Sequence, residues 1–383
     1  MTASATATAT PTPTATATPI PTATAATPSG TATATASAPL PTASATPLAL
    51  GLPDPEAASG ARRCQSAFER AGSAFVAHKL GALARCTSPI LRCLQSGGSA
   101  VCLEKAGARC RTRLARLTGA RAKLDAAIVR ACSKRPLAID HVRNVLGLNF
   151  DDRAADCRTR FGLELSDLGS IVNCVARQHG CIAERIFQHH VPRAKEMLRV
   201  ARVDDAALAE LPCLPDFGGT GAGLTDASDT RAALRCHATL TAGGLRLTRR
   251  RLATLDRCVD AAFACVQTRR DDAGCVGAAG ITCRKALARL AAAADKARTA
   301  IVARCGDDAV TYQRLRSPAG LGLTAVDPSC AALGHPAPDS AAAYAACALR
   351  HHECAARDLL DYEAPRARDL LQALGLTLPA GCP

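Results

Sequence analysis

Residues 236–305 read CHATLTAGGLRLTRRRLATLDRCVDAAFACVQTRRDDAGCVGAAGITCRKALARLAAAADKARTAIVARC, and their six cysteines are placed symmetrically about position 270. From the outside inward, the pairs are Cys236 with Cys305, Cys258 with Cys283, and Cys265 with Cys275. Such mirror symmetry is expected when two antiparallel segments fold about a turn and are cross-linked at matching heights. The stretch therefore predicts a hairpin that is clipped by three nested disulfides.

The second arm of this hairpin has the spacing of an α-helix. Its apolar residues and cysteines recur at steps of three and four, at Cys283, Leu287, Leu290, Ala294, Ala297, Ile301 and Cys305. In each arm the outer two cysteines are 22 residues apart. That gap is six helical turns plus about 40°, so both cysteines share one face, roughly 33 Å apart. We therefore expect both arms to be helices.

The same arrangement occurs earlier in the chain. Its pairs are Cys64 with Cys132, Cys86 with Cys110, and Cys93 with Cys102. One nearly constant shift along the chain, which takes Cys64 to Cys236, superimposes nine cysteines of the first half on nine of the second, and other residues recur with them. We interpret the chain as two tandem repeats, residues 56–215 and 228–383, which are joined by a flexible glycine-rich linker at residues 216–227.

After each hairpin the sequence predicts an irregular connector and then a third helix. The N-cap candidates of that helix are Ser166 or Asp167 in the first repeat and Asp339 or Ser340 in the second. Pro192 and Pro365 fall within its helical pattern, so we expect a kink or a break into two shorter helices. Pro89 is expected to kink or break a hairpin helix in the first repeat only.

Four cysteines of each repeat lie outside the ladder and allow three pairings. Cys174 and Cys181 are seven residues apart on one helix, about 10 Å, which is too far for a disulfide. Of the two pairings that remain, the shorter reach from Cys213 back to Cys181 favours Cys157–Cys174 with Cys181–Cys213. The same reasoning predicts Cys330–Cys347 and Cys354–Cys382.

The cysteine usage also indicates a compartment. The chain has 20 cysteines and no C-x-x-C spacing, so the signatures of zinc ribbons, thioredoxin-type motifs and haem attachment are missing. Disulfides in this number are typical of an oxidising compartment, and we expect an extracellular, periplasmic or cell-surface protein. The sequence contains no run of 18 apolar residues, so we expect no transmembrane helix. Because the first residues do not resemble a signal peptide, we expect the true start to lie upstream or the sequence to be a fragment.

Residues 1–50 contain no charged residue and consist almost throughout of Thr, Ala, Pro and Ser. Such a segment cannot bury a core, and its prolines favour an extended chain. We predict a disordered stalk at residues 1–55, which is either an O-glycosylated spacer or an inert tail.

The stalk, the cysteine ladder and the kink motifs, VPRA at 191–194 and APRA at 364–367, together resemble uncharacterised secreted proteins of environmental bacteria. The resemblance spans nearly the full chain. It implies an exported, cysteine-rich helical-repeat architecture and carries no particular activity.

Two histidine-containing clusters are the first candidates for chemistry. They pair His179 with Arg177 in the first repeat and His352 with Arg350 in the second. A metal site needs three or four convergent ligands, and adjacent side chains on a helix diverge, so a packing or solvated role is favoured. H-E-x-x-H, G-x-S-x-G and Walker motifs are missing, and every cysteine fits the disulfide pattern. We therefore expect no catalytic residue, no metal and no cofactor.

The formal charge is +14, from 47 Lys and Arg against 33 Asp and Glu. An excess of basic residues on helices favours acidic partners. The aromatic content of only 3% disfavours the stacking of bases on the protein, and we therefore do not expect specific nucleic-acid binding. We predict an all-α, non-catalytic, secreted or surface-displayed structural or binding module, with anionic surfaces or polymers as candidate partners. The alternative is an enzyme or metal-binding protein that uses the His179/His352 region. The oligomeric state is left open.

Overall fold

The computed structural model describes residues 51–134, 137–306, 309–377 and 382. Within these ranges all regular secondary structure is helical and no strand is present, so the predicted all-α class is confirmed. The predicted stalk falls mostly on residues 1–50, outside the described part. Its last residues do not fit a stalk, because Leu52 is buried and its N–H donates to Gln267 Oε1 at 2.9 Å.

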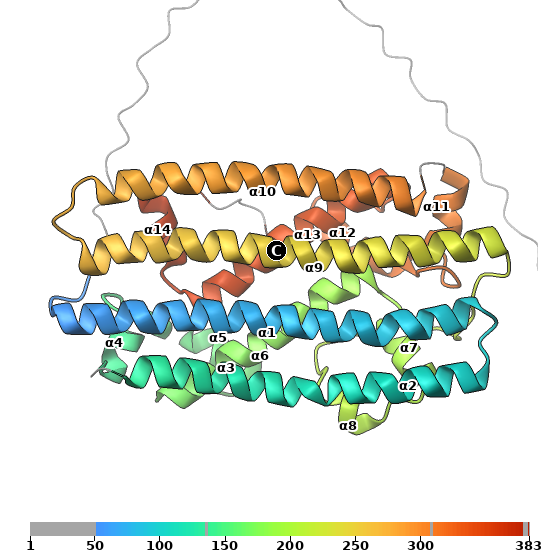
Figure 1. The fold of residues 1–383 in the computed structure, drawn as a ribbon, viewed down its shortest axis with the longest axis horizontal. Helices are drawn as coiled ribbons and strands as arrows, with labels where there is room; N and C mark the ends of the chain where they lie inside the picture. The colour runs from blue at the N-terminus through green and yellow to red at the C-terminus, as the bar shows by residue number, and fades with distance from the viewer. Residues whose placement is uncertain (1–50, 135–136, 307–308, 378–381, 383) are drawn as a thin grey trace, which may run out of the picture. The chain divides into compact units, whose positions relative to one another are not determined.

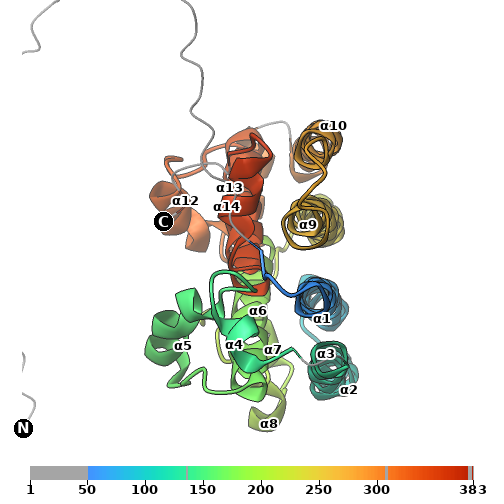
Figure 2. The same ribbon diagram turned by 90° about the vertical axis from the view of Figure 1, so that its left-hand side faces the viewer.

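Five long helices lie side by side in one layer (Figures 1 and 2). They are α1 (Pro55–Gln95), α2 (Ala100–Leu114), α3 (Arg116–Ser133), α9 (Ala227–Thr268) and α10 (Cys275–Cys305). Their order across the layer is α2 with α3, then α1, α9 and α10 (Figure 1). We call this arrangement the long-helix layer.

Local sequence explains where the longest helices begin. Asp54 caps α1 by accepting the Ala57 N–H at 2.7 Å, and a proline occupies the first helical position. Asp226 caps α9 by accepting the Ser228 and Asp229 N–H groups. Alanine, leucine and arginine favour the helical interior, and the small side chains let neighbouring helices approach closely.

The predicted break at Pro89 is wrong. Helix α1 continues through this proline to Gln95. Cys86 and Cys93, on either side of the proline, are bonded to the neighbouring helix, and Ile90 is fully buried. Tertiary packing therefore outweighs the one backbone hydrogen bond that proline removes. The chain departs from a single helix elsewhere, at Ala115, which separates α2 from α3.

One face of the long-helix layer is covered by the remaining helices, and two of them, α6 and α13, pack against the layer and against each other (Figure 2). In the first half these elements are α4 (Ile139–Arg143), η1 (Phe150–Arg153), α5 (Ala154–Phe161), α6 (Leu168–His190), α7 (Ala194–Val200) and α8 (Asp205–Leu208). In the second half they are α11 (Ala309–Arg316), η2 (Leu323–Val326), α12 (Asp327–Ala332), α13 (Ala341–Glu363) and α14 (Ala367–Ala373). The connectors that the sequence predicts as irregular thus contain short helices.

The third helix of each half begins and ends near the predicted signals. Asp167 caps α6 in a capping box with Ser170, and Ser340 caps α13 by accepting the Ala343 N–H. At Pro192 and Pro365 the helix breaks into two, α6 with α7 and α13 with α14.

All twenty cysteines are paired, with Cα–Cα distances of 4.4 to 5.7 Å. The pairs are the ones that the sequence predicts: Cys64–Cys132, Cys86–Cys110, Cys93–Cys102, Cys157–Cys174 and Cys181–Cys213, then Cys236–Cys305, Cys258–Cys283, Cys265–Cys275, Cys330–Cys347 and Cys354–Cys382. Ten disulfides are typical of an oxidising, extracellular environment. Among the described helices, none has the length and apolarity that crossing a membrane requires.

The described residues of both halves belong to one compact unit, in which α1 packs directly on α9. The segment predicted as a flexible linker is held by hydrogen bonds to the first half. The Gly221 N–H donates to Glu196 Oε1 at 2.8 Å, the Leu224 N–H donates to Gln95 Oε1 at 2.9 Å, and Arg193 donates to Ala222 O at 2.7 Å. The glycine-rich segment is therefore an ordered connection and not the flexible linker that the sequence predicts.

Candidate functional site

The first candidate histidine lies in the interior. His179 on α6 is 0% exposed, and its Nε2 lies 3.0 Å from Oε2 of Glu363 on α13, which is also 0% exposed. Its Nδ1 must donate to Val175 O, 2.8 Å away, because a carbonyl can only accept. In a neutral ring Nε2 is then an acceptor, so the proton of this pair belongs to the carboxyl. Burial lowers the pKa of His179 to about 4 and raises the pKa of Glu363 to about 8, in agreement with this assignment.

The second candidate histidine forms a different buried pair. His352 Nε2 on α13 lies 2.6 Å from His190 Nε2 on α6, and His352 Nδ1 lies 3.0 Å from Thr248 Oγ1. Burial lowers the pKa of both histidines, that of His190 to about 3, so both rings are neutral at pH 7. One ring nitrogen donates to the other across the contact between α6 and α13.

Each pair joins one residue from each half, and the members of the two pairs lie at corresponding positions in the sequence. The shift that takes Cys157 to Cys330 also takes His179 to His352 and His190 to Glu363. A glycine of the long-helix layer faces each pair. A Cβ on Gly72 would lie 2.6 Å from Glu363 Oε2, and a Cβ on Gly244 would lie 1.8 Å from His190 Cε1.

Sequence reasoning placed His190 on the face of His179 and Glu363 at the matching position, but it predicted neither the contact of His179 with Glu363 nor that of His352 with His190, and it missed both glycines. The shift that takes Cys64 to Cys236 also takes Gly72 to Gly244. Aligning the cysteines therefore aligns these residues as well, so the signal was present.

Further carboxyl groups lie beside the His179–Glu363 pair. Glu69 and Asp256 are 1% and 8% exposed, and burial raises the pKa of each, with help from the neighbouring acidic groups. Among the described residues no group of three or more His, Cys, Asp or Glu side chains is arranged to hold a metal ion. The pairs are sealed between helices, and a dissolved substrate would have no access to them.

Glu363→Gln tests where the proton of the pair lies. Glutamine can still donate to His179 Nε2 but does not titrate. Because the folded pKa of about 8 lies above the ordinary value of 4.5, the stabilisation by the protonated carboxyl is complete below pH 4.5 and is lost as the pH rises to 8. From pH 5 to 8 the native protein should therefore lose stability relative to the variant by roughly 1 kcal/mol per pH unit.

Urea unfolding at pH 5, 6, 7 and 8 measures this difference between the two proteins. Asp256, Glu69 and His179 titrate in both proteins, so the contributions that burial makes to their pKa values cancel in the comparison, whereas the part that Glu363 adds for Asp256 and Glu69 does not. A difference that stays constant with pH would show that Glu363 is ionised in the native state.

The two candidate arginines are not part of these pairs. Arg350 donates to Glu353 Oε2 at 2.8 Å on α13. Arg177 is exposed on α6, and within the described part of the chain it forms no ion pair. The structure therefore separates the predicted arginines from the predicted histidines.

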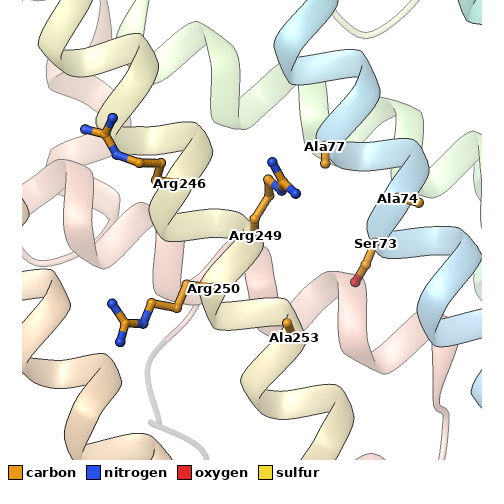
Figure 3. A pocket seen from close by; sticks show the side chains of 7 residues that line it. All are labelled: Ser73, Ala74, Ala77, Arg246, Arg249, Arg250 and Ala253. Carbon is orange, nitrogen blue, oxygen red and sulfur yellow. The ribbon is translucent and has the colours of Figure 1, made fainter.

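The exposed side of the long-helix layer has a different character. A hollow of about 440 Å³ lies between α1 and α9 and is lined by Ser73, Ala74, Ala77, Arg246, Arg249, Arg250 and Ala253. Figure 3 shows that Arg249 extends from α9 toward α1, while Arg246 and Arg250 extend away from α1. Alanine and serine side chains are too short to fill the space between the helices, which leaves a hollow with a basic rim.

Two of these arginines also border a second hollow. It has a volume of about 240 Å³ and lies between α9 and α10, where Arg246, Arg250 and Lys296 contribute the charge. Arg246, Arg249 and Arg250 are exposed, and none of them forms an ion pair with another described residue. We call Arg246, Arg249 and Arg250 the arginine cluster.

Charge is segregated between the layer and the rest of the chain. The five helices of the layer contain 27 Lys and Arg and 8 Asp and Glu, a formal charge of +19. Since the whole chain carries +14, the remainder carries −5. On α9 the acidic residues Asp229 and Asp256 are buried. The exposed charged residues of α9 are all basic: Arg231, Arg235, Arg246, Arg249, Arg250 and Arg257.

Comparisons of this chain with protein-family models, with curated proteins and with solved structures find no match.

Proposed function

We propose that the protein is a non-catalytic, secreted or surface-displayed binding module that holds anionic polymers or surfaces on its long-helix layer. The observation that carries the proposal is the charge of +19 on the five helices of this layer. Guanidinium groups pair with carboxylate, sulfate and phosphate in a planar, two-pronged geometry. Unpaired arginines beside hollows are available for such contacts.

The aromatic residues of the layer disfavour the stacking of nucleic-acid bases on this surface. Its helices contain Phe68, Phe75 and Phe263 as their only aromatic side chains, and all three are buried. Base stacking needs exposed aromatic faces, which these helices do not supply. Binding through arginine alone is electrostatic and depends on charge density along the partner.

A second candidate function, an enzyme or metal-binding protein built on His179 and His352, has less support. Both side chains are buried and engaged with partners from the opposite half. Their distance from solvent and the neutral state of the rings favour a packing role. We therefore retain the binding module as the proposal.

Retention on immobilised dextran sulfate, with immobilised dextran as the uncharged match, tests the proposal. We expect binding to dextran sulfate in dilute buffer, loss of binding as the salt concentration rises, and no binding to dextran. The logarithm of the affinity should fall linearly with the logarithm of the salt concentration, because each contact releases counterions. Equal retention on both matrices would refute the proposal.

The arginine cluster should contribute a large share of this binding. Replacing Arg246, Arg249 and Arg250 together by serine should reduce the salt slope by about 3, since each lost contact removes roughly one counterion. The fold should persist, because the three side chains are exposed.

A matched variant removes the same charge from the other side of the protein. Arg143, Arg158 and Arg199 are paired with acidic side chains outside the long-helix layer. Their replacement by serine should leave the salt slope nearly unchanged. An equal loss in both variants would mean that net charge, and not the layer, determines binding.

A further inference from the structure

A hollow of about 490 Å³ in the first half lies between α1, α3 and α6, and the segment 209–213 closes one side of it. Its apolar lining consists of Phe75, Leu117, Phe161 and Ala176, and its basic lining consists of Lys79, Arg121, Arg160 and Arg177. Pockets for small molecules commonly have about this volume and combine apolar walls with a few polar groups. The hollow is remote in the sequence from the arginine cluster and shares no residue with it.

The base of this pocket is a buried, hydrogen-bonded ion pair. Lys79 and Glu184 are 4% and 0% exposed, and Lys79 Nζ lies 2.5 Å from Glu184 Oε1. Lys79 also donates to Glu210 O at 3.0 Å, and Glu184 accepts the Cys213 N–H at 2.7 Å. An ammonium group has three N–H donors, so Lys79 keeps one donor for a further acceptor.

The second half fills the corresponding space with its own side chains. Leu349 stands where the first half has Ala176, and it packs with Leu247 and Leu290 in a small apolar cluster. Leu247 and Leu290 correspond to Phe75 and Leu117 of the pocket. The smaller side chain of Ala176 therefore leaves space that leucine occupies in the other half.

A second difference concerns charge. Glu353 of the second half corresponds to Gly180 of the first. Its carboxylate is bound by Arg350 at 2.8 Å and by Arg251 at 3.2 Å. These two residues correspond to Arg177 and Lys79. The first half thus keeps both cationic groups and lacks the carboxylate at the position of Glu353, although Lys79 is paired with Glu184 from another position.

We propose that this pocket binds a small organic acid with an apolar body. The acid's carboxylate takes the place that the Glu353 carboxylate has in the second half, next to Arg177 and Lys79, and its body contacts Phe75, Leu117 and Phe161. A Cβ on Gly180 would lie 3.2 Å from Lys79 Nζ, so a carboxylate at this point is within reach of the ammonium group. Arg160 adds positive charge around it, whereas the charge of Arg121 is paired with Asp125 at 2.9 Å.

Isothermal titration calorimetry on the full chain tests this site with three probes. Octanoate has the charge and the apolar body, 1-octanol has only the body, and acetate has only the charge. We expect octanoate to bind at least about tenfold more tightly than either of the others, because a charge-assisted hydrogen bond and apolar burial act together. No saturable octanoate binding up to 10 mM, or equal binding of 1-octanol, would overturn the proposal.

Variants that copy the second half locate the site. Gly180→Glu supplies an internal carboxylate and Ala176→Leu supplies the missing volume, so each should weaken octanoate binding by about tenfold or more. Arg177→Gln should weaken octanoate binding and leave 1-octanol unaffected. Circular dichroism checks that each variant is folded. The three substitutions lie at different positions in the pocket, so the test remains valid if one variant does not fold. Octanoate affinity that is unchanged in the folded variants would refute this location.

The variant lacking the arginine cluster separates this inference from the proposed function. It should bind octanoate as the native protein does, because none of the three arginines lines the pocket. Conversely, Arg177→Gln removes one charge outside the long-helix layer and should retain binding to dextran sulfate. Joint loss of both activities in either variant would contradict two separate sites.

Discussion

Replacing Gly244 by alanine is expected to destabilise the protein by about 2–4 kcal/mol, which combines the cost of overpacking with that of a disrupted buried hydrogen bond. A Cβ at this position would lie 1.8 Å from His190 Cε1 and 2.5 Å from His190 Nε2. His190 cannot withdraw freely, because its Nε2 is 2.6 Å from His352 Nε2 in a buried contact. The free energy of unfolding from urea titrations at pH 7 measures the effect.

The adjacent glycine is a matched control. Gly243 lies on the same helix, and a Cβ there would meet nothing within 4 Å. Gly243→Ala should therefore stabilise the protein by up to about 1 kcal/mol, since alanine is the better helix former. If both variants changed the free energy of unfolding equally, His190 could not lie as close to α9 as the structure shows.

Gly72→Ala extends the test to the other pair. Its Cβ would lie 2.6 Å from Glu363 Oε2 and 2.7 Å from His179 Nε2, so a loss of about 1–3 kcal/mol is expected. Gly119 on α3 has no neighbour within 4 Å of a built Cβ, and Gly119→Ala is its control. Destabilisation at both facing glycines and at neither control would establish that the helices approach closely at both pairs.

The disulfide-clipped hairpins were predictable because cysteine spacing encodes distance directly. A helix rises by the same amount with every residue, about 1.5 Å, so equal spacings on two antiparallel arms place cysteines at equal heights. The same constancy decided between Cys181–Cys213 and its alternatives. The helix breaks at Pro192 and Pro365 were also predictable, whereas the continuous helix at Pro89 depends on contacts between helices that spacing does not contain.

The candidate sites were harder to predict because they depend on which helices become neighbours. The sequence intersperses acidic and basic residues, so charge is scattered along the chain. Only when α1 and α9 lie side by side do Ser73, Ala77 and Arg249 border a common hollow. Likewise, the contact of His179 with Glu363 joins residues that are 184 positions apart. Local periodicity carries no information on such pairs.

In the interpretation of the chain as two repeats, equivalent positions have diverged in chemically consistent ways. One buried pair combines histidine with a protonated carboxyl, and the other combines two histidines. One half fills a space with Leu349 and Glu353, and the other leaves it open at Ala176 and Gly180. A scaffold held by disulfides tolerates such changes, because the covalent ladder maintains the helix positions while individual contacts change. This freedom would let one half acquire a binding pocket while the other half keeps its own core.

Removing the Cys236–Cys305 disulfide by double substitution to alanine should destabilise the protein by about 4 kcal/mol in the chain-entropy model, because the bond closes a loop of about 70 residues. The matched control is Cys265–Cys275, with a sequence separation of 10, for which the same model gives about 3 kcal/mol. Both bonds join α9 to α10 or to its start, so the comparison isolates loop length at constant chemistry.

Urea unfolding of both double variants, under conditions that keep the other disulfides intact, gives the two free energies. We expect the free energy of unfolding to be highest for the native protein, lower for the variant that lacks Cys265–Cys275, and lowest for the variant that lacks Cys236–Cys305. The larger loss should also appear as a lower melting temperature. Equal stability of the native protein and the Cys236–Cys305 variant would refute the stabilising role of the ladder, since that bond constrains the longest loop of the second half. The opposite order of the two variants would show that packing around Cys265 outweighs loop closure.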